Sequence, residues 1–339
     1  MITSDLWGLL MKYKIGDLTK IRTGKLDANA ATVDGIYPFF TCSKESLRIS
    51  TYSYDCECVL VAGNGDLNVK YYNGKFDAYQ RTYIIESNGN KNLYVPYLYY
   101  FMDKYVEELR IQAIGGVIKY IKLGNLTEAM IELPGIDRQR EIVHILNKVK
   151  DVIECRITEL RMLDELIKAR FVEMFGDPLV NSKNLPTEQM GQRFNLKAGI
   201  TTAAENIHDF EKGKFEVPCY GGNGIRGYVS EKSYSGTYPI IGRQGALCGN
   251  VQYATGDFHA TEHAVLVSLL KDDNPIWVYY LLKLMDLYRF HTGAAQPGLA
   301  VKTLNTVDVI VVNKNLQTQF AIFVEQIDKS KVVGLKIVS

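Results

Sequence analysis

The sequence predicts an α/β (α+β) protein in which two repeated mixed α/β domains are separated by long helices that pack lengthwise. Residues 136–175 contain no proline or glycine and place apolar residues at helical spacing. Strand-like runs precede this stretch, and a similar order of runs returns about 180 residues later. The 339 residues, of which 47% are hydrophobic, are enough for two domains with separate cores.

Residues 1–135 are expected to form the first domain. Its hydrophobic or alternating runs, YPFFTCS, ECVLVAG and RTYIIES, are broken by glycine and asparagine, which is typical of strands. Residues 95–110 begin beside Pro96 and carry tyrosines, leucines and valines at helical spacing, which predicts a helix. The run AMIELP predicts a last strand before the long helix.

Residues 136–176 are expected to form a spacer helix of roughly 60 Å, at 1.5 Å per residue. Its seam positions alternate by four and three residues, which is the heptad pattern of a coiled coil. Arg156 and Arg170 occupy two seam positions, so the seam is expected to fix register or to meet acidic partners. Gly176 and Pro178 are expected to end the helix.

Residues 177–313 are expected to form the second domain. YPFF is echoed by VPCY, VLVAGNGD by PIIGRQGA, and YQRTYIIES by HATEHAVLVS, which aligns Tyr79 with His259. The order is kept while the identity is low, so the two domains should share a fold and differ in what they contact. Residues 314–339 are expected to form a shortened helix from Leu316 to about Lys331, roughly 24 Å long, followed by a strand-like tail.

Composition excludes several classes of protein. The formal net charge is +1, so local patches or basic partners must supply any attraction to nucleic acid. No run approaches the eighteen or so apolar residues of a membrane span, and the N-terminus has no basic leader pattern, so a cytoplasmic protein is expected. The six cysteines include only one C-x-C pair, Cys56 and Cys58, which predicts reduced thiols.

One motif points to catalysis. His259, Glu262 and His263 match the H-x-x-E-H pattern, in which two histidines on one helix face bind zinc and the glutamate acts as base. The segment instead runs into the strand-like AVLVSLL, so zinc chemistry is a minor alternative. No phosphate-binding loop or dinucleotide fingerprint occurs, and we expect no cofactor, no metal and no catalytic residue.

Four segments carry a family resemblance: LPGIDRQREIVHIL, ELRMLDELIKARFVEMFGDP, QPGLAVKTLNTVDV and LQTQFAIFVEQIDKSK. With the two-fold repeat, they resemble the specificity subunits of type I restriction-modification systems, over residues 13–331. The resemblance implies a non-catalytic protein in which two target-recognition domains each read one half of a bipartite DNA sequence. It also implies that the conserved helices pair antiparallel and set the gap between the half-sites.

The resemblance also implies partners: double-stranded DNA, two methyltransferase subunits and, in the full assembly, two restriction subunits that translocate and cut DNA. These partners use S-adenosylmethionine, ATP and magnesium. Because the second helix is short, an alternative stays open, in which the chain is a truncated or silent copy that acts as a scaffold without reading DNA. The target sequence, the gap length and self-association are beyond what the sequence predicts.

Candidate DNA-contacting residues share a polar or basic side chain beside a glycine-rich turn or strand end, where a loop can approach a groove. Arginine pairs with guanine, and asparagine or glutamine pairs with adenine. The candidates are Arg22, Lys25, Asn64, Lys70 and Arg81 in the first domain, and Thr201, Thr202, Arg226, Arg243, Gln244, Thr261 and Gln296 in the second.

Overall fold

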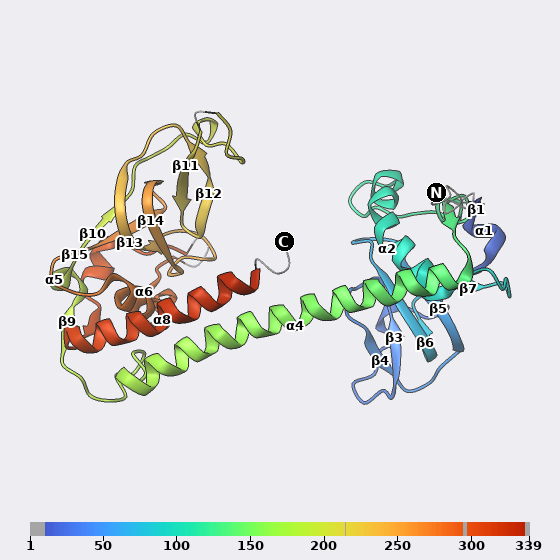
Figure 1. Cartoon of the computed structure of the whole chain (residues 1–339), viewed down its shortest axis with the longest axis horizontal. Helices are drawn as coiled ribbons and strands as arrows, with labels where there is room; N and C mark the ends of the chain where they lie inside the picture. The colour runs from blue at the N-terminus through green and yellow to red at the C-terminus, as the bar shows by residue number, and fades with distance from the viewer. Residues whose placement is uncertain (1–10, 214, 294–296, 336–339) are drawn as a thin grey trace, which may run out of the picture. The chain divides into compact units, whose positions relative to one another are not determined.

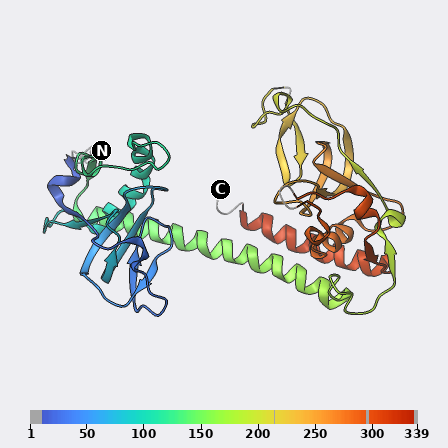
Figure 2. The ribbon, with the colours of Figure 1, turned by 180° about the vertical axis from the view of Figure 1, so that it is seen from behind.

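The computed structural model describes residues 11–213, 215–293 and 297–335 (Figure 1). The chain divides into two compact units, unit 1 (Met1–Glu154) and unit 2 (Cys155–Ser339), with the division inside one helix. Each unit contains a six-stranded sheet with helices beside it, which confirms the predicted α/β class (Figure 2). The exact domain limits proposed above stay a prediction.

The sheet of unit 1 has the strand order β2-β7-β5-β6-β3-β4. Neighbouring strands are antiparallel except β3 and β6, which run parallel. A two-stranded sheet pairs β1 with β8. The strands are β1 (Met11–Lys14), β2 (Thr19–Thr23), β3 (Tyr37–Phe40), β4 (Leu47–Ile49), β5 (Tyr54–Ala62), β6 (Val69–Ala78), β7 (Thr82–Ser87) and β8 (Met130–Leu133); the helices are α1 (Ile15–Leu18), η1 (Ala28–Ala30), α2 (Val95–Gln112) and α3 (Leu123–Thr127).

Two cores cover the two faces of this sheet. Successive residues of a strand point to opposite faces, and β5 shows the alternation. Val59 and Val61 join the core that α2 covers, while Cys58 and Leu60 join a second core. The all-hydrophobic run in β5 is therefore explained by burial on both faces.

Unit 2 repeats the same topology. Its sheet has the order β10-β15-β13-β14-β11-β12, with β11 and β14 as the parallel pair, and β9 pairs with β16. The predicted repeat is thereby confirmed. The strands are β9 (Thr187–Gln189), β10 (Phe194–Ala198), β11 (Val217–Gly221), β12 (Gly224–Val229), β13 (Tyr234–Gly242), β14 (Val251–Ala260), β15 (Ala264–Leu269) and β16 (Asp308–Ile310); the helices are α5 (Met190–Arg193), η2 (Ala204–Asn206), α6 (Pro275–Leu284), η3 (Leu287–Phe290) and α7 (Val301–Asn305).

The predicted alignment of Tyr79 with His259 was wrong by two residues. The backbone N–H of Tyr79 bonds Phe40 O, and the N–H of Thr261 bonds Tyr220 O, so Tyr79 and Thr261 are equivalent. His259 is consequently the counterpart of Asp77. The loops 79–81 and 261–263 have the same length, so the error lay in the register at which the two runs were matched. The order of hydrophobic runs does not fix that register when the identity is low.

Helix α4 spans Ile136–Phe175, as predicted. Gly176 follows with φ +78° and donates its N–H to Val172 O, which is the left-handed cap expected of glycine. Arg156 and Arg170 pair with Glu159 and Glu173 on the same helix, one turn away. These arginines therefore find their acidic partners within α4.

Helix α8 spans Lys314–Leu335, so the prediction of a strand-like tail after Lys331 was wrong for residues 332–335. Extending an existing helix over valines costs little. Contacts with α4 run antiparallel: Lys331 pairs with Asp164 at 2.7 Å, and Phe320 packs edge-on against Phe171. Figures 1 and 2 both show α8 beside the C-terminal part of α4. Coiled-coil packing as such stays a prediction.

Candidate nucleic-acid interface

Several loops of unit 1 meet at one end of its sheet. Gly24 donates its N–H to Thr82 O, Gly63 donates to Arg81 O, and Ile121 donates to Gly63 O. A Cβ on Gly63 would lie 2.4 Å from Arg81 O, so only glycine permits this approach. We call this region, residues 24–26, 63–65, 79–81 and 114–121, the loop end of unit 1.

Three candidate residues of the first domain lie together at the loop end. Lys25 and Arg81 are exposed, and Asn64 is half-buried. Arg81 and Gly63 help to line a cavity of about 250 Å³, and Thr23, Gln80, Tyr83 and Ile121 complete its wall. The arrangement offers two cationic side chains and an amide beside a small polar hollow.

The other two candidates of this domain lie on strands and already have partners. Arg22 on β2 forms an ion pair with Glu86 at 2.6 Å and lies over the ring of Tyr54. Lys70 on β6 donates to Asn68 Oδ1, and burial lowers the pKa of its ammonium group. Both side chains are thus engaged within the unit, and neither is among the exposed groups of the loop end.

Unit 2 has an equivalent loop end. Ile200 pairs with Thr261, Arg243 donates its N–H to His263 O, and Gln244 pairs with Gly298. Gly242 is the counterpart of Ala62, and a Cβ on it would lie 2.1 Å from Gly222 O. The loop end of unit 2 comprises residues 199–202, 221–223, 242–245, 261–263 and 297–299.

The candidates of the second domain differ in accessibility. Thr201 and Gln244 are exposed at the loop end, Thr202 and Arg243 are half-buried there, and Arg226 is exposed on β12. Thr261 departs from the expectation of a surface contact, because its pairing with the 199–202 loop leaves its side chain fully buried. Gln296 lies outside the described residues.

Sequence reasoning did not predict a polar anchor beneath this loop end. His259 is 9% exposed, and its Nε2 lies 2.8 Å from Thr202 Oγ1. The Thr202 hydroxyl donates its proton to Ile200 O, so it accepts from Nε2–H, and His259 Nδ1 accepts from the Ser233 hydroxyl. Burial lowers the pKa of His259, which favours this neutral form.

This geometry also settles what the H-x-x-E-H motif forms. His259 belongs to strand β14, while Glu262 and His263 lie in the turn that follows. The two histidines do not share a helix face, and both ring nitrogens of His259 bond hydroxyl groups. The arrangement that a zinc peptidase requires is therefore not formed. No group of three or more His, Cys, Asp or Glu side chains suited to a metal occurs among the described residues.

A second feature missed from the sequence is an apolar hairpin at the loop end of unit 1. Ile114 and Tyr120 exchange both backbone hydrogen bonds, at 3.0 and 2.8 Å. The residues between them include Val117, which is fully exposed, and Ile118, which is 63% exposed. The signal in the sequence was the pair Gly115 and Gly116 inside an otherwise apolar run, IQAIGGVIKYIKL.

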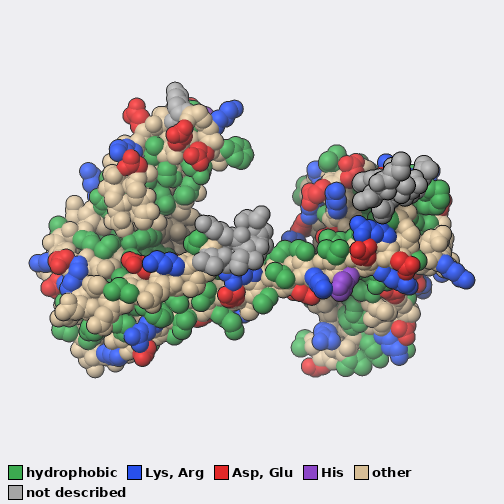
Figure 3. Space-filling view, in the orientation of Figure 1, with side chains coloured by type: hydrophobic (Ala, Val, Ile, Leu, Met, Phe, Trp, Pro, Cys, Tyr) green, Lys and Arg blue, Asp and Glu red, His purple; other side chains and the backbone are tan. Residues whose placement is uncertain are grey.

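Charge is mixed over the surface. Figure 3 shows basic and acidic side chains interspersed on the visible face of each unit. Next to the loop end of unit 1, Asp66 lies 3.5 Å from Arg110 and 3.9 Å from Lys44. This pattern agrees with the small net charge and gives positive potential only locally.

Within residues 11–213, 215–293 and 297–335, no helix is both long and apolar enough to cross a bilayer.

Curated proteins with similar sequences are specificity subunits. The chain is 33% identical over 245 residues to the specificity subunit of the type I restriction enzyme EcoprrI from Escherichia coli, covering 69% of this chain and 61% of that protein. It is 37% identical over 155 residues to the EcoDI specificity subunit of the same species, covering 46% and 34%. The chain thus spans less than two thirds of either relative.

Solved structures share the fold. The S subunit of a type I restriction-modification system from M. genitalium matches with a TM-score of 0.69 and 19% identity, covering 100% of this chain and 94% of that one. A chain from a study of complex assembly in the type I R-M system matches with a TM-score of 0.53 and 13% identity, covering 97% and 92%.

The family model for the type I restriction modification DNA specificity domain matches residues 9–162 and 191–333. The two matched segments correspond to the two copies of the sheet and their helices. The chain belongs to the family of type I restriction-modification DNA specificity domains.

Proposed function

We propose that the chain is a DNA sequence-recognition subunit of a type I restriction-modification enzyme, in which each unit reads one half of a bipartite target. The observation that carries this proposal is the duplicated loop end. Two sheets of identical strand order expose loops at the same end, and these loops present different side chains. Two related readers with different contacts suit a target of two unlike halves.

The exposed and half-buried residues of the two loop ends have the chemistry for base and phosphate contact. Arg81 and Lys25 in unit 1, and Arg243 in unit 2, are able to bind phosphates or guanine edges. Asn64 and Gln244 are able to pair with adenine. Arg22, Lys70 and Thr261 have internal partners or are buried, so we assign them a supporting role. Thr201 and Arg226 complete the proposed contacts, and Thr202, whose hydroxyl bonds Ile200 O and His259, has a supporting role as well.

Methylation and cleavage are assigned to other chains. We infer that two methyltransferase subunits dock on α4 and α8 and that two restriction subunits join the full assembly in the cytoplasm. Support comes from α4, where Val149, Val152 and Ile153 are each at least 42% exposed. In Figure 3 hydrophobic side chains lie along this part of α4. The helices then set the gap between half-sites.

Selection from random DNA tests the proposal. The chain is co-expressed with its cognate methyltransferase subunit, and the complex is mixed with random duplexes at one fixed salt concentration. We expect enrichment of a two-part motif with a constant gap. A stable complex that enriches no motif contradicts DNA reading and supports a scaffold or silent copy. Failure to form any complex contradicts the proposed partners.

A further inference from the structure

The hairpin at residues 114–120 of unit 1 is an unusual surface feature. Ile111, Ile114, Val117, Ile118, Tyr120 and Leu123 are all exposed within thirteen residues of sequence, at 38% or more. Exposed apolar side chains that cluster in one short segment often mark a binding surface. The fold has buried hydrophobic cores nearby, so the exposure of these side chains has a cost that a function must offset.

The hairpin is held firmly in place. Besides the two bonds between Ile114 and Tyr120, Gly65 donates its N–H to Lys119 O at 2.9 Å, and Ile121 donates to Gly63 O at 2.9 Å. Gly115 has φ +121°, and a Cβ there would lie 2.6 Å from Ile118 O. The tip is therefore presented in a fixed conformation, which lowers the entropy lost on binding.

Its position joins it to the candidate DNA contacts. The segment 119–121 lies beside Gly63–Gly65, and Gly63 in turn bonds to Arg81. Lys119 and Lys122 flank the apolar tip and are exposed, as is Arg81. An apolar tip between cationic side chains matches DNA, whose phosphates flank apolar base faces and thymine methyl groups.

We propose that Val117 and Ile118 make apolar contact with the bases of the half-site read by unit 1, while the flanking lysines contact its phosphates. Short aliphatic side chains in this position pack against thymine methyl groups or wedge against a base step. This inference rests on the proposed function of unit 1. It assigns sequence discrimination to a hairpin that carries no hydrogen-bonding side chain at its tip.

The test uses the complex with the methyltransferase subunit and the variant Val117→Ser/Ile118→Ser. We expect its affinity for the selected target to fall roughly tenfold or more. Its affinity for unrelated DNA and the dependence of binding on salt should stay unchanged, because no charge is removed. Val33→Ser is the matched control, since Val33 is also fully exposed but lies near the first residue of β3, at the opposite end of the same sheet.

A second measurement locates the contact. In the first half-site, each thymine is replaced in turn by uracil, which removes its methyl group. A neighbouring base is replaced by 2-aminopurine, whose fluorescence reports unstacking. We expect the wild-type complex to respond at one position, and the double variant to respond there less. Val117→Ser alone serves if the double variant does not fold.

The outcomes separate this inference from the proposed function. If the wild type enriches no sequence, both proposals fail. If the wild type is specific and the double variant binds the same target equally well, only the role of the hairpin is contradicted. If the double variant instead loses its methyltransferase subunit while Val33→Ser keeps it, the hairpin is a protein-docking element and the inference is overturned.

Discussion

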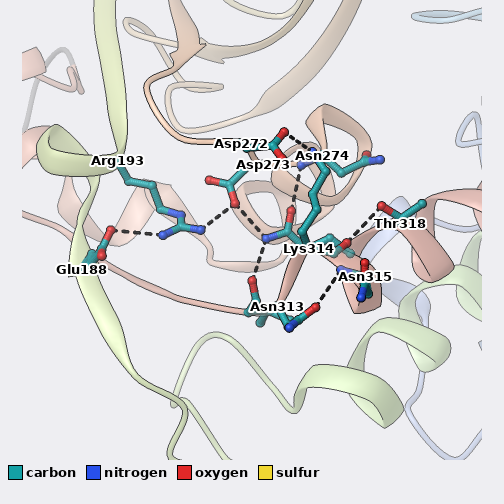
Figure 4. A network of polar contacts seen from close by, with 11 residues as sticks. Glu188, Arg193, Asp272, Asp273, Asn274, Asn313, Lys314, Asn315 and Thr318 are labelled. Carbon is teal, nitrogen blue, oxygen red and sulfur yellow. Dashed lines mark hydrogen bonds and ion pairs between the residues drawn. The ribbon is translucent and has the colours of Figure 1, made fainter.

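Arg193 and Asp273 form a buried ion pair that links the start of the unit 2 sheet to its α6 helix. Their charged atoms are 2.5 Å apart, and their side chains are 7% and 1% exposed. Figure 4 shows Arg193 between Asp273 and Glu188, with the residues around the start of α8 close by. Asp273 also accepts a hydrogen bond from Gln317 of α8, so one carboxylate connects three segments of the unit.

Removing this carboxylate should strongly destabilise unit 2. In Asp273→Ala the Arg193 guanidinium stays buried without its main partner, and we expect a loss of about 3–5 kcal/mol in the free energy of unfolding. Urea unfolding followed by the fluorescence of Trp277, in a Trp7→Phe background, measures the loss. The control is Asp272→Ala, whose 90% exposed side chain pairs with Lys314 and should contribute less than about 1 kcal/mol. Equal losses in the two variants contradict the prediction.

Gln139 and Gln317 occupy the same position in the two copies, near the start of α4 and of α8. Gln139 accepts from Tyr94 N–H and donates to Asn92 O and Pro134 O. Gln317 accepts from Asn274 N–H in the same manner. Each amide thus joins α4 or α8 to the start of the helix that packs on the sheet of the same unit, α2 or α6.

Gln139→Leu should therefore destabilise unit 1. The change leaves buried backbone groups without partners, which costs about 1–3 kcal/mol. Chemical denaturation followed by circular dichroism measures the change, with Arg138→Ala as the control, because Arg138 is exposed on the same turn and forms only a surface ion pair with Glu141. If Gln139→Leu is as stable as the control variant, the hydrogen bonds of the Gln139 side chain contribute nothing to the stability of unit 1.

His259 should make the stability of unit 2 depend on pH. Burial lowers the pKa of the folded-state imidazole below its ordinary value of 6.5, so the unfolded chain binds the proton more readily. Stability from this group is present above pH 6.5 and is lost as the pH falls from there toward the folded-state pKa. The gap in melting temperature between the wild type and His259→Asn should thus be larger at pH 8 than at pH 5.5. A gap independent of pH contradicts this account.

The regular elements could be predicted because their signals are local. Helix α4 was predicted to the residue, since its interior lacks glycine and proline and Gly176 with Pro178 follows. The repeat was visible because buried strands and turn glycines recur in order. At the end of α8, the valines predicted a strand, but the helix continues through them because extending an existing helix outweighs their low helix propensity.

Accessibility in the loops was harder to predict, because it depends on partners distant in the sequence. Arg22 was predicted to be available for DNA, but Glu86 on β7 forms an ion pair with it. Thr261 was predicted to lie on the surface, but the 199–202 loop buries it. The role of His259 depends on Thr202 and Ser233, which lie 57 and 26 residues away. From the sequence pattern alone, apolar residues such as Val117 and Ile118 are predicted to be buried in the core.

The contact between α4 and α8 should account for much of the stability of unit 2. Phe320 is fully buried and meets Phe171, Phe175 and Tyr280 edge-on. Phe320→Ala should cost about 3–5 kcal/mol, from lost transfer energy and a cavity. Ile322→Ala is the control, because Ile322 lies on the same helix and is 51% exposed, and this variant should lose far less stability. Similar losses in urea unfolding exclude a packed α4–α8 contact.

Arg81 and Gln244 should each affect one half of the target and leave the other half unchanged. Arg81→Ala removes an exposed cation at the loop end of unit 1, and Gln244→Ala removes an exposed amide at that of unit 2. If each side chain reads a base, the variant loses about 1–3 kcal/mol of discrimination at one position of its own half-site. Selection from random duplexes measures this directly. A phosphate contact by Arg81 would instead weaken binding to all DNA sequences alike and reduce the salt dependence of binding by about one charge.

Lys20→Ala is the control for these two variants, because Lys20 is exposed near the opposite end of β2. A loss at both half-sites from either single variant contradicts the assignment of one half-site to each unit.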